Sequence, residues 1–368
     1  MRFDHALAAI EKNPPRETLP EILHTLLTPP DEAAEKALFT AAYAVKLQHI
    51  GNGVSLRGLI EISNICTRDC YYCGIRKSNT AMNRYCMSRE EIVEYAALAG
   101  KFGYGSVVLQ SGERSDRDFV RWIAQLLRDI RKLPGDLGIT LSCGEQSLAT
   151  YRCWRECGAS RYLLRIESAD EAVYRRIHPP APGDFNSRCQ ALHDLRRAGY
   201  QVGTGVMIGI PGTDISHLVK DLLFFQQTDP DMIGMGPFIP QPETPMGMEF
   251  PDEPGSGNRR LTLALRMIAV TRLLLKDVNI AATTALQALD PENGRQRGLL
   301  AGANVIMPNV GDVAYRKNYQ LYNGKPDLDE NADDIRAALT ASLQRIGEYP
   351  RLNEHGDSPR FAKRSING

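Results

Sequence analysis

Hydrophobic and polar positions follow two different patterns along the chain. The first fifty residues show helical periodicity interrupted at Pro14-Pro15 and Pro29-Pro30, and Ala33–Gln48 is the clearest amphipathic segment. Beyond this region, short apolar runs alternate with helical stretches, which is typical of parallel strands joined by crossover helices. The pattern therefore predicts an amino-terminal helical cap over residues 1–50 and an α/β domain over residues 51–348.

The α/β region contains eight predicted strands. They are Leu59–Ile65, Ser106–Gln110, Ile139–Ser142, Tyr162–Ile166, Gln201–Ile208, Met232–Gly236, Asn279–Ala282 and Asn304–Met307. An open doubly wound sheet has the same alternation, so the number eight is what favours a closed (β/α)8 TIM-type barrel. In such a barrel the catalytic groups are expected where the strands end, and several predicted strands do run into polar residues there.

Composition and charge narrow the class of function. The 368 residues include 44 Lys and Arg and 44 Asp and Glu, so the formal net charge is zero. The sequence lacks the basic stripe that would predict a nucleic-acid partner. No apolar run approaches the roughly 20 residues that a membrane helix needs, and the amino terminus lacks the apolar core of a signal peptide. We expect a cytoplasmic protein with a small substrate, ending in a mobile polar tail over residues 349–368.

Three cysteines directly follow the first predicted strand. Cys66, Cys70 and Cys73 are separated by three and then two residues within one short loop. Three thiolates leave one iron of a 4Fe-4S cluster open to another ligand. The amino and carboxylate groups of S-adenosylmethionine can bind that iron, and electron transfer then cleaves the cofactor to a 5'-deoxyadenosyl radical. The motif predicts a radical S-adenosylmethionine enzyme.

A zinc site or a set of buried thiols is the alternative interpretation of this motif. Zinc sites usually combine paired Cys-x2-Cys knuckles with a fourth ligand, and nothing nearby in the sequence provides the pair. Cys153 and Cys157 lie one helical turn apart, and we expect them to pack as small hydrophobic residues. Packing is also favoured for Cys143, at the end of the third strand, over a position facing the cavity. Cys86 and Cys189 carry no prediction.

Polar residues at other strand ends are further candidates. Gln110–Glu113 ends the second strand beside a glycine that allows close approach of a ligand to the backbone. Arg165 and Glu167 are two residues apart and share one face of a strand, so we expect an inward-facing pair that contacts cofactor or substrate. A structural ion pair is the alternative. The hydroxyls of Thr283-Thr284 suit a carboxylate, although threonine is also a good strand former.

Several segments carry a resemblance to a known family. They are Gly58–Gly74, Val108–Glu113, Arg161–Glu167, Gly234–Pro240, Ala282–Thr284 and Gly302–Asn309, with Tyr315–Leu321 also similar. Together they resemble the HydE family, the radical S-adenosylmethionine maturase of FeFe hydrogenase within the biotin synthase-like superfamily. The resemblance implies a full (β/α)8 barrel with one 4Fe-4S cluster. It also implies cofactor contacts at Tyr72, Ser142, Glu167 and Arg188, and a substrate cavity at Gln110, Arg161, Thr284 and Tyr319.

The resemblance also implies a substrate and partners. The substrate would be a cysteine-derived iron carbonyl-cyanide species, and a reductant such as ferredoxin or flavodoxin would supply electrons. The other hydrogenase maturases are possible partners. Some members carry three further cysteines near the carboxyl terminus for an auxiliary cluster, but this chain has none after Cys189. A methylornithine synthase, a biotin-synthase-like enzyme and a non-enzymatic iron-sulfur scaffold or metallochaperone are the alternatives.

Overall fold

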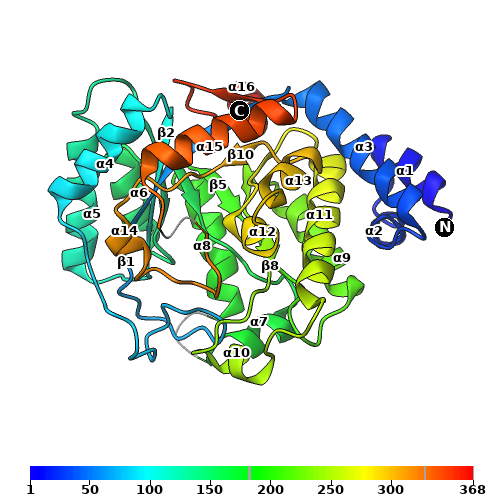
Figure 1. The fold of residues 1–368 in the computed structure, drawn as a ribbon, viewed down its shortest axis with the longest axis horizontal. Coiled ribbons are helices and arrows are strands. Elements are labelled where there is room, and N and C mark those ends of the chain that lie inside the picture. The colour runs from blue at the N-terminus through cyan, green and yellow to red at the C-terminus, as the bar shows by residue number, and fades with distance from the viewer. Residues whose placement is uncertain (181–183, 327–328, 368) are drawn as a thin grey trace.

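Eight parallel strands form a closed ring at the centre of the described part of the chain. The computed structural model describes residues 1–180, 184–326 and 329–367, and Figure 1 shows the strands at its centre. The strands are β1 (Gly53–Ser63), β2 (Ser106–Ser111), β3 (Gly138–Ser142), β4 (Arg161–Leu163), β5 (Gln201–Thr204), β7 (Met232–Ile233), β9 (Asn279–Ile280) and β10 (Val305–Ile306). All pairs are parallel, in the order β10-β1-β2-β3-β4-β5-β7-β9. A parallel bridge between Ala281 and Val305 closes the ring, so the predicted barrel is confirmed.

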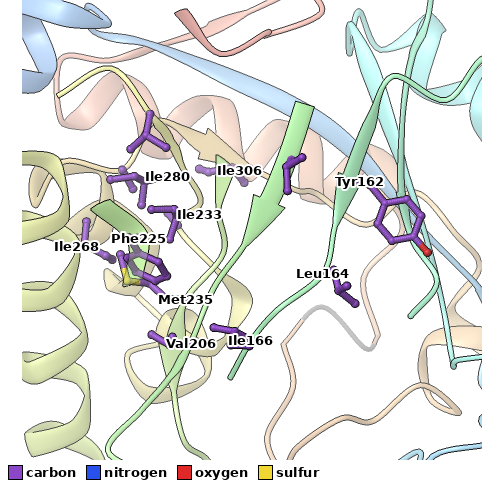
Figure 2. Close-up of a cluster of buried hydrophobic side chains, with 14 of the residues drawn as sticks. Tyr162, Leu164, Ile166, Val206, Phe225, Ile233, Met235, Ile268, Ile280 and Ile306 are labelled. Carbon is purple, nitrogen blue, oxygen red and sulfur yellow. The ribbon is translucent and has the colours of Figure 1, made fainter. Parts of the chain in front are cut away.

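Successive side chains of a strand face opposite sides of the barrel wall. In β1, Leu59 and Glu61 line a cavity inside the barrel, whereas Ile60 and Ile62 belong to the main hydrophobic core. This period of two follows from the pleat of the strand. Figure 2 shows part of the core, including Ile166, Val206, Phe225, Ile233, Ile268 and Ile280. Burial of each such side chain is worth about 1.5–3 kcal/mol relative to exposure, and this gain holds the helices against the strands.

Helices surround the strands. Ser88 and Glu91 form a capping box at the first of these helices, and Asp116 accepts a hydrogen bond from the Phe119 N–H at the second. Such caps satisfy N–H groups that the first helical turn leaves free. The helices of the barrel are α4 (Arg89–Lys101), α5 (Arg117–Ile130), α6 (Leu148–Glu156), α7 (Glu171–Ile177), α8 (Phe185–Arg197), α9 (Ile215–Thr228), α10 (Pro245–Glu249), α11 (Ser256–Leu275), α12 (Thr284–Leu289), α13 (Gly294–Leu300) and α14 (Val313–Arg316).

The fifth and sixth predicted strands are each divided in the structure. The divisions produce β6 (Met207–Ile208) and β8 (Gly236–Pro237), which pair with each other in a separate two-stranded sheet. A side chain at Gly205 would collide with the carbonyl group of Gly234. The two segments therefore approach each other at a backbone contact that only glycine permits, and the ladder breaks there.

The amino-terminal helices lie on the flank of the barrel. They are α1 (Phe3–Glu11), α2 (Leu19–Leu27) and α3 (Glu32–His49), at the right of Figure 1. The second helix contacts α9 and α11, and the third contacts α11 and α13. Their buried leucines belong to the same core as the barrel helices. The expected helical cap is thus an outer layer beside the barrel.

The carboxyl-terminal segment is folded and does not match the expected mobile tail. After α15 (Ala332–Arg345), β11 (Tyr349–Arg351) pairs with the start of β1, and α16 (Pro359–Asn367) follows. Arg360 forms ion pairs with Asp229 and Asp277. The charged side chains of this segment pair with carboxylates near the amino-terminal end of the barrel. Because those carboxylates are distant in the sequence, the composition of the segment alone suggested a mobile tail.

A buried ion pair ties this segment to the amino-terminal helices and gives the first prediction. Lys46 and Glu348 are in contact, and both side chains are fully buried. Glu348→Ala is expected to lower the free energy of unfolding by about 3–5 kcal/mol, because the Lys46 ammonium group stays buried without its counter-charge. Chemical denaturation measures the change.

The control for this prediction is an exposed pair. Arg121 and Asp118 lie on the surface of α5 with side chains 74% and 86% exposed. Asp118→Ala is expected to change the free energy of unfolding by less than about 1 kcal/mol. Equal effects of Glu348→Ala and Asp118→Ala would contradict the stabilising role given to the buried Lys46–Glu348 ion pair.

Candidate active site

A cavity of about 300 Å³ lies inside the barrel at the carboxyl-terminal ends of the strands. Its lining includes Glu61 of β1, Gln110 of β2, Ser142 of β3 and Thr284 at the start of α12. In a parallel barrel all strand ends of this kind meet at one mouth, so residues distant in the sequence become neighbours. The cavity is large enough for a small molecule.

The three predicted cluster ligands lie on one loop at this mouth. Cys66, Cys70 and Cys73 all line the cavity. Backbone N–H groups of Arg68 and Glu113 donate to the Cys66 sulfur at 3.4 and 3.3 Å. N–H donors directed at a ligating sulfur are one of the means by which proteins tune iron-sulfur clusters. The donor set and its N–H partners therefore fit an iron-sulfur cluster.

The thiols of this loop lie in surroundings that oppose their ionisation. Burial raises the pKa of Cys70 to about 12, and Arg188 offsets part of that increase. Burial also raises the pKa values of Cys66 and Cys73. Bound iron supplies the positive charge that a buried thiolate requires, so deprotonation and cluster binding are coupled here. Among the described residues, no three His, Cys, Asp or Glu side chains converge on a single-ion site.

Two arginines and two glutamates form a charged network beside the cluster loop. Arg188 Nε donates to Glu145 Oε1 at 2.5 Å, and Arg68 Nη2 donates to Glu145 Oε2 at 3.3 Å. Arg68 also pairs with Glu113, and Arg188 lies 3.9 Å from the same carboxylate. Charge-assisted bonds of this kind fix the guanidinium planes. The network therefore orients both cations at the cavity wall.

The predicted Arg165–Glu167 pair is also found at this wall. Arg165 Nη2 lies 2.9 Å from Glu167 Oε2, and Arg165 Nε has no hydrogen-bond partner among the described residues. Glu167 adopts a left-handed backbone with φ of 63°, a conformation that costs free energy for a non-glycine residue. Buried polar atoms without partners need a ligand or water. The pair thus lies at the edge of the cavity with a free N–H of Arg165 beside it.

Tyrosines and a lysine complete the opposite side of the cavity. The hydroxyl groups of Tyr322 and Thr284 are 2.7 Å apart. Lys325 donates to Glu61 and, at 2.8 Å, to the carbonyl group of Tyr319. All five side chains line the cavity. Hydroxyl, ammonium and carboxylate groups at one wall suit a polar, amino-acid-like molecule.

The cavity brings together all but one of the residues predicted from the sequence. Those present are Cys66, Cys70, Cys73, Tyr72, Ser142, Glu167, Arg188, Gln110, Thr284 and Tyr319. Their individual roles stay predictions. Arg161 is the exception, because it is the first residue of β4 and lies near the amino-terminal end of the barrel. It donates to Thr140 and Asp357 there and does not line the cavity, so its predicted place in the substrate cavity is wrong.

Sequence reasoning missed three members of the site. Arg68 lies between two of the cysteines, Lys325 lies in the segment after α14, and both line the cavity. Glu145 follows the third strand by three residues and pairs with the cavity-lining Arg68 and Arg188. Glu145 lies shortly after a predicted strand, where the polar residues of a barrel site are expected, so its position was a usable signal. No signal in the sequence pairs Lys325 with Glu61, which lies 264 residues away.

The remaining cysteines do not line the cavity. Cys157 is part of the main core and Cys153 packs against it, which confirms the predicted packing role. Cys143 is buried in the same core and lies 3.8 Å from the carbonyl oxygen of Leu109. Cys86 is exposed.

Comparison with known proteins identifies the family. A model described as the Radical SAM superfamily matches residues 60–225. The FeFe hydrogenase maturase subunit HydE of Thermotoga maritima is 43% identical over 342 residues, which cover 93% of this chain and 94% of the relative. The chain belongs to the HydE family. It is a radical S-adenosylmethionine enzyme that uses a 4Fe-4S cluster and S-adenosylmethionine.

Other proteins similar to this HydE-family chain share most of its length. The 3-methylornithine synthase of Methanosarcina acetivorans is 30% identical and covers 89% of both chains. A solved methylornithine synthase, PylB, has 27% identity and a TM-score of 0.74 over 92% of this chain and 97% of its own. The maturase HydG from Carboxydothermus hydrogenoformans has a TM-score of 0.77 at 20% identity, over 95% and 79% of the two chains, which shows a shared fold. None of the described helices has both the length and the apolar character needed to cross a membrane.

The charged network gives the second prediction. Glu145→Gln is expected to weaken equilibrium binding of S-adenosylmethionine about three- to tenfold, because Arg188 loses the carboxylate that orients it. Glu156→Gln is the matched control, since Glu156 is an exposed carboxylate at the end of α6. Unchanged affinity in Glu145→Gln would show that the network does not support cofactor binding.

Proposed function

We propose that this enzyme acts in the maturation of the diiron active-site cluster of FeFe hydrogenase. The observation that carries the proposal is 43% identity to a HydE protein across nearly all of both chains. The cavity supports it, because three thiols, four cations and three carboxylates line one enclosed space. The proposed substrate is a cysteine-derived iron carbonyl-cyanide precursor, in which the adenosyl radical attacks the cysteine sulfur.

Cys66, Cys70 and Cys73 would hold the cluster, which when bound would supply the one electron that cleaves S-adenosylmethionine to methionine and a 5'-deoxyadenosyl radical. The protein orients the reactants and excludes water. Glu167 and Arg188 lie beside the cluster loop, and we assign them with Ser142 to the cofactor. Thr284, Tyr319 and Gln110 line the cavity with that group, and we assign these three to the substrate. A walled cavity protects a radical from side reactions.

The proposal includes partners and a location. We infer a small electron-transfer protein such as ferredoxin or flavodoxin as reductant, because cleavage consumes one electron. The other hydrogenase maturases would supply the precursor and accept the product. The cytoplasm is the proposed location, since cysteines without disulfide partners persist in a reducing compartment.

The third prediction tests the reaction. Protein reconstituted anaerobically with iron and sulfide is expected to produce 5'-deoxyadenosine from S-adenosylmethionine and dithionite, as measured by chromatography. Cys66→Ala is expected to abolish the product, because it removes one of three cluster ligands. Cys153→Ala keeps the activity, since Cys153 packs against the core. A reconstituted cluster without cleavage would instead support the scaffold alternative.

A second candidate function is methylornithine synthesis, favoured by the 30% identical synthase and the similar PylB structure. Complementation separates the two functions. A strain that lacks its HydE maturase is expected to regain FeFe-hydrogenase activity when it produces this chain. If that strain stays inactive and a strain lacking methylornithine synthase recovers, the proposed function is overturned.

A further inference from the structure

Tyr72 lies in the cluster loop between Cys70 and Cys73 and lines the cavity. Its hydroxyl group is 3.3 Å from Nε2 of His178. The other ring nitrogen of His178, Nδ1, is 2.9 Å from the carbonyl oxygen of Tyr174. A chain of hydrogen bonds thus runs from the cavity wall to the end of α7.

The donors in this chain follow from its chemistry. A carbonyl oxygen only accepts, so Nδ1 of His178 carries the hydrogen. In a neutral imidazole Nε2 then has a free lone pair and accepts from the Tyr72 hydroxyl. Burial lowers the pKa of His178 to about 3, and Arg188 adds to this effect. The ring is therefore neutral at physiological pH, and one arrangement of the hydrogen bonds is selected.

Packing fixes the same side chains. The His178 ring stacks on Tyr174 with centroids 4.1 Å apart and meets Tyr72 edge-on at 5.6 Å. Tyr72 also packs against a hydrophobic cluster that is separate from the main core and consists of Val173, Ile177, Met207, Ile210, Phe238 and Met246. The Tyr71 N–H donates to the Ile177 carbonyl at 3.0 Å. The end of α7 thus holds the cluster loop by backbone, ring and hydroxyl contacts.

We propose that His178 is a positioning residue for S-adenosylmethionine. By accepting the Tyr72 hydroxyl, it holds the tyrosine ring as a fixed face of the cavity beside the cluster ligands. A purine stacks on such a face, and a ring already held in place loses less conformational entropy when the ligand binds. The inference rests on the proposed use of Tyr72 in cofactor binding and adds the residue that orients it.

A double-mutant cycle is the fourth prediction. Tyr72→Phe keeps the ring, His178→Phe replaces the imidazole with another aromatic ring, and each change removes one partner of the hydrogen bond. Each single variant is expected to bind S-adenosylmethionine about three- to tenfold more weakly, in line with the loss of one hydrogen bond. His178→Phe also leaves a buried hydroxyl group without a partner and lowers the melting temperature.

The double variant separates positioning from a purely structural role. With both partners removed, neither side chain leaves the other unpaired, and the Tyr174 carbonyl still accepts from the His178 backbone N–H at 3.2 Å, so the melting temperature is expected to recover towards that of the wild type. The affinity is expected to stay at the level of the single variants, because the ring is still not anchored. An affinity that recovers together with the melting temperature, or a His178→Phe single variant with wild-type affinity, would overturn the proposal.

Equilibrium binding is measured without reductant on anaerobically reconstituted enzyme of matched iron content, so no turnover is needed. His193→Phe, on the exposed face of α8, is the control and keeps wild-type affinity. If the wild type itself fails to bind the cofactor, the assignment of the site fails and not the role of His178. If the wild type binds and cleaves the cofactor but matures no hydrogenase, the proposed function fails and the cycle still decides the role of His178.

Discussion

Closure of a parallel barrel is the constraint on which the site depends. Every strand runs in the same direction, so all carboxyl-terminal ends meet at one mouth. The first strand leads directly into the cysteine loop, and β2 and β3 end with Gln110-Ser111 and Ser142 at the same cavity. An open sheet would spread these residues along an edge. Closure through the Ala281–Val305 bridge instead arranges them around one cavity.

Many charged side chains lie close together at the mouth of the barrel, where they are largely shielded from water. Every arginine or lysine that lines the cavity has a carboxylate within ion-pair distance. Arg68 pairs with Glu113 and Glu145, and Arg188 pairs with Glu145. Arg165 pairs with Glu167, and Lys325 pairs with Glu61. An unpaired buried charge would cost several kcal/mol. Pairing removes most of that cost and aligns the groups before any ligand binds. Among the described residues, Arg68 Nη1 and Arg165 Nε still lack a hydrogen-bond partner, so these two arginines can still recognise a ligand at the wall.

Sequence patterns were sufficient for the barrel and for most of the cavity. Apolar runs mark buried parallel strands clearly, and strand ends identify Gln110, Ser142 and Thr284. The errors have physical causes. β1 begins at Gly53 and not at the predicted Leu59. The apolar pattern placed the start too late because Ser55 and Arg57 interrupt the apolar run of the strand.

Arg161 shows a different limit of sequence reasoning. It lies in the same motif as Arg165 and Glu167, yet it begins the strand that Glu167 follows. The two ends of a barrel strand lie at opposite ends of the barrel, so Arg161 and Glu167 are far apart. The partner of Arg161 is Asp357, in a tail whose pairing across 196 residues no local pattern reveals.

The segment after α14 shows how the mouth is closed without a second metal centre. The resemblance to HydE proteins raised the question of an auxiliary cluster, but this chain has no cysteine after Cys189. Instead the Leu321 carbonyl accepts from the Gly74 N–H at 3.0 Å, directly after the last cluster cysteine. Tyr322 bonds to Thr284, and Lys325 pairs with Glu61. Hydrogen bonds to three separate parts of the mouth hold the segment in place, so enclosure of the cavity does not require a second cluster.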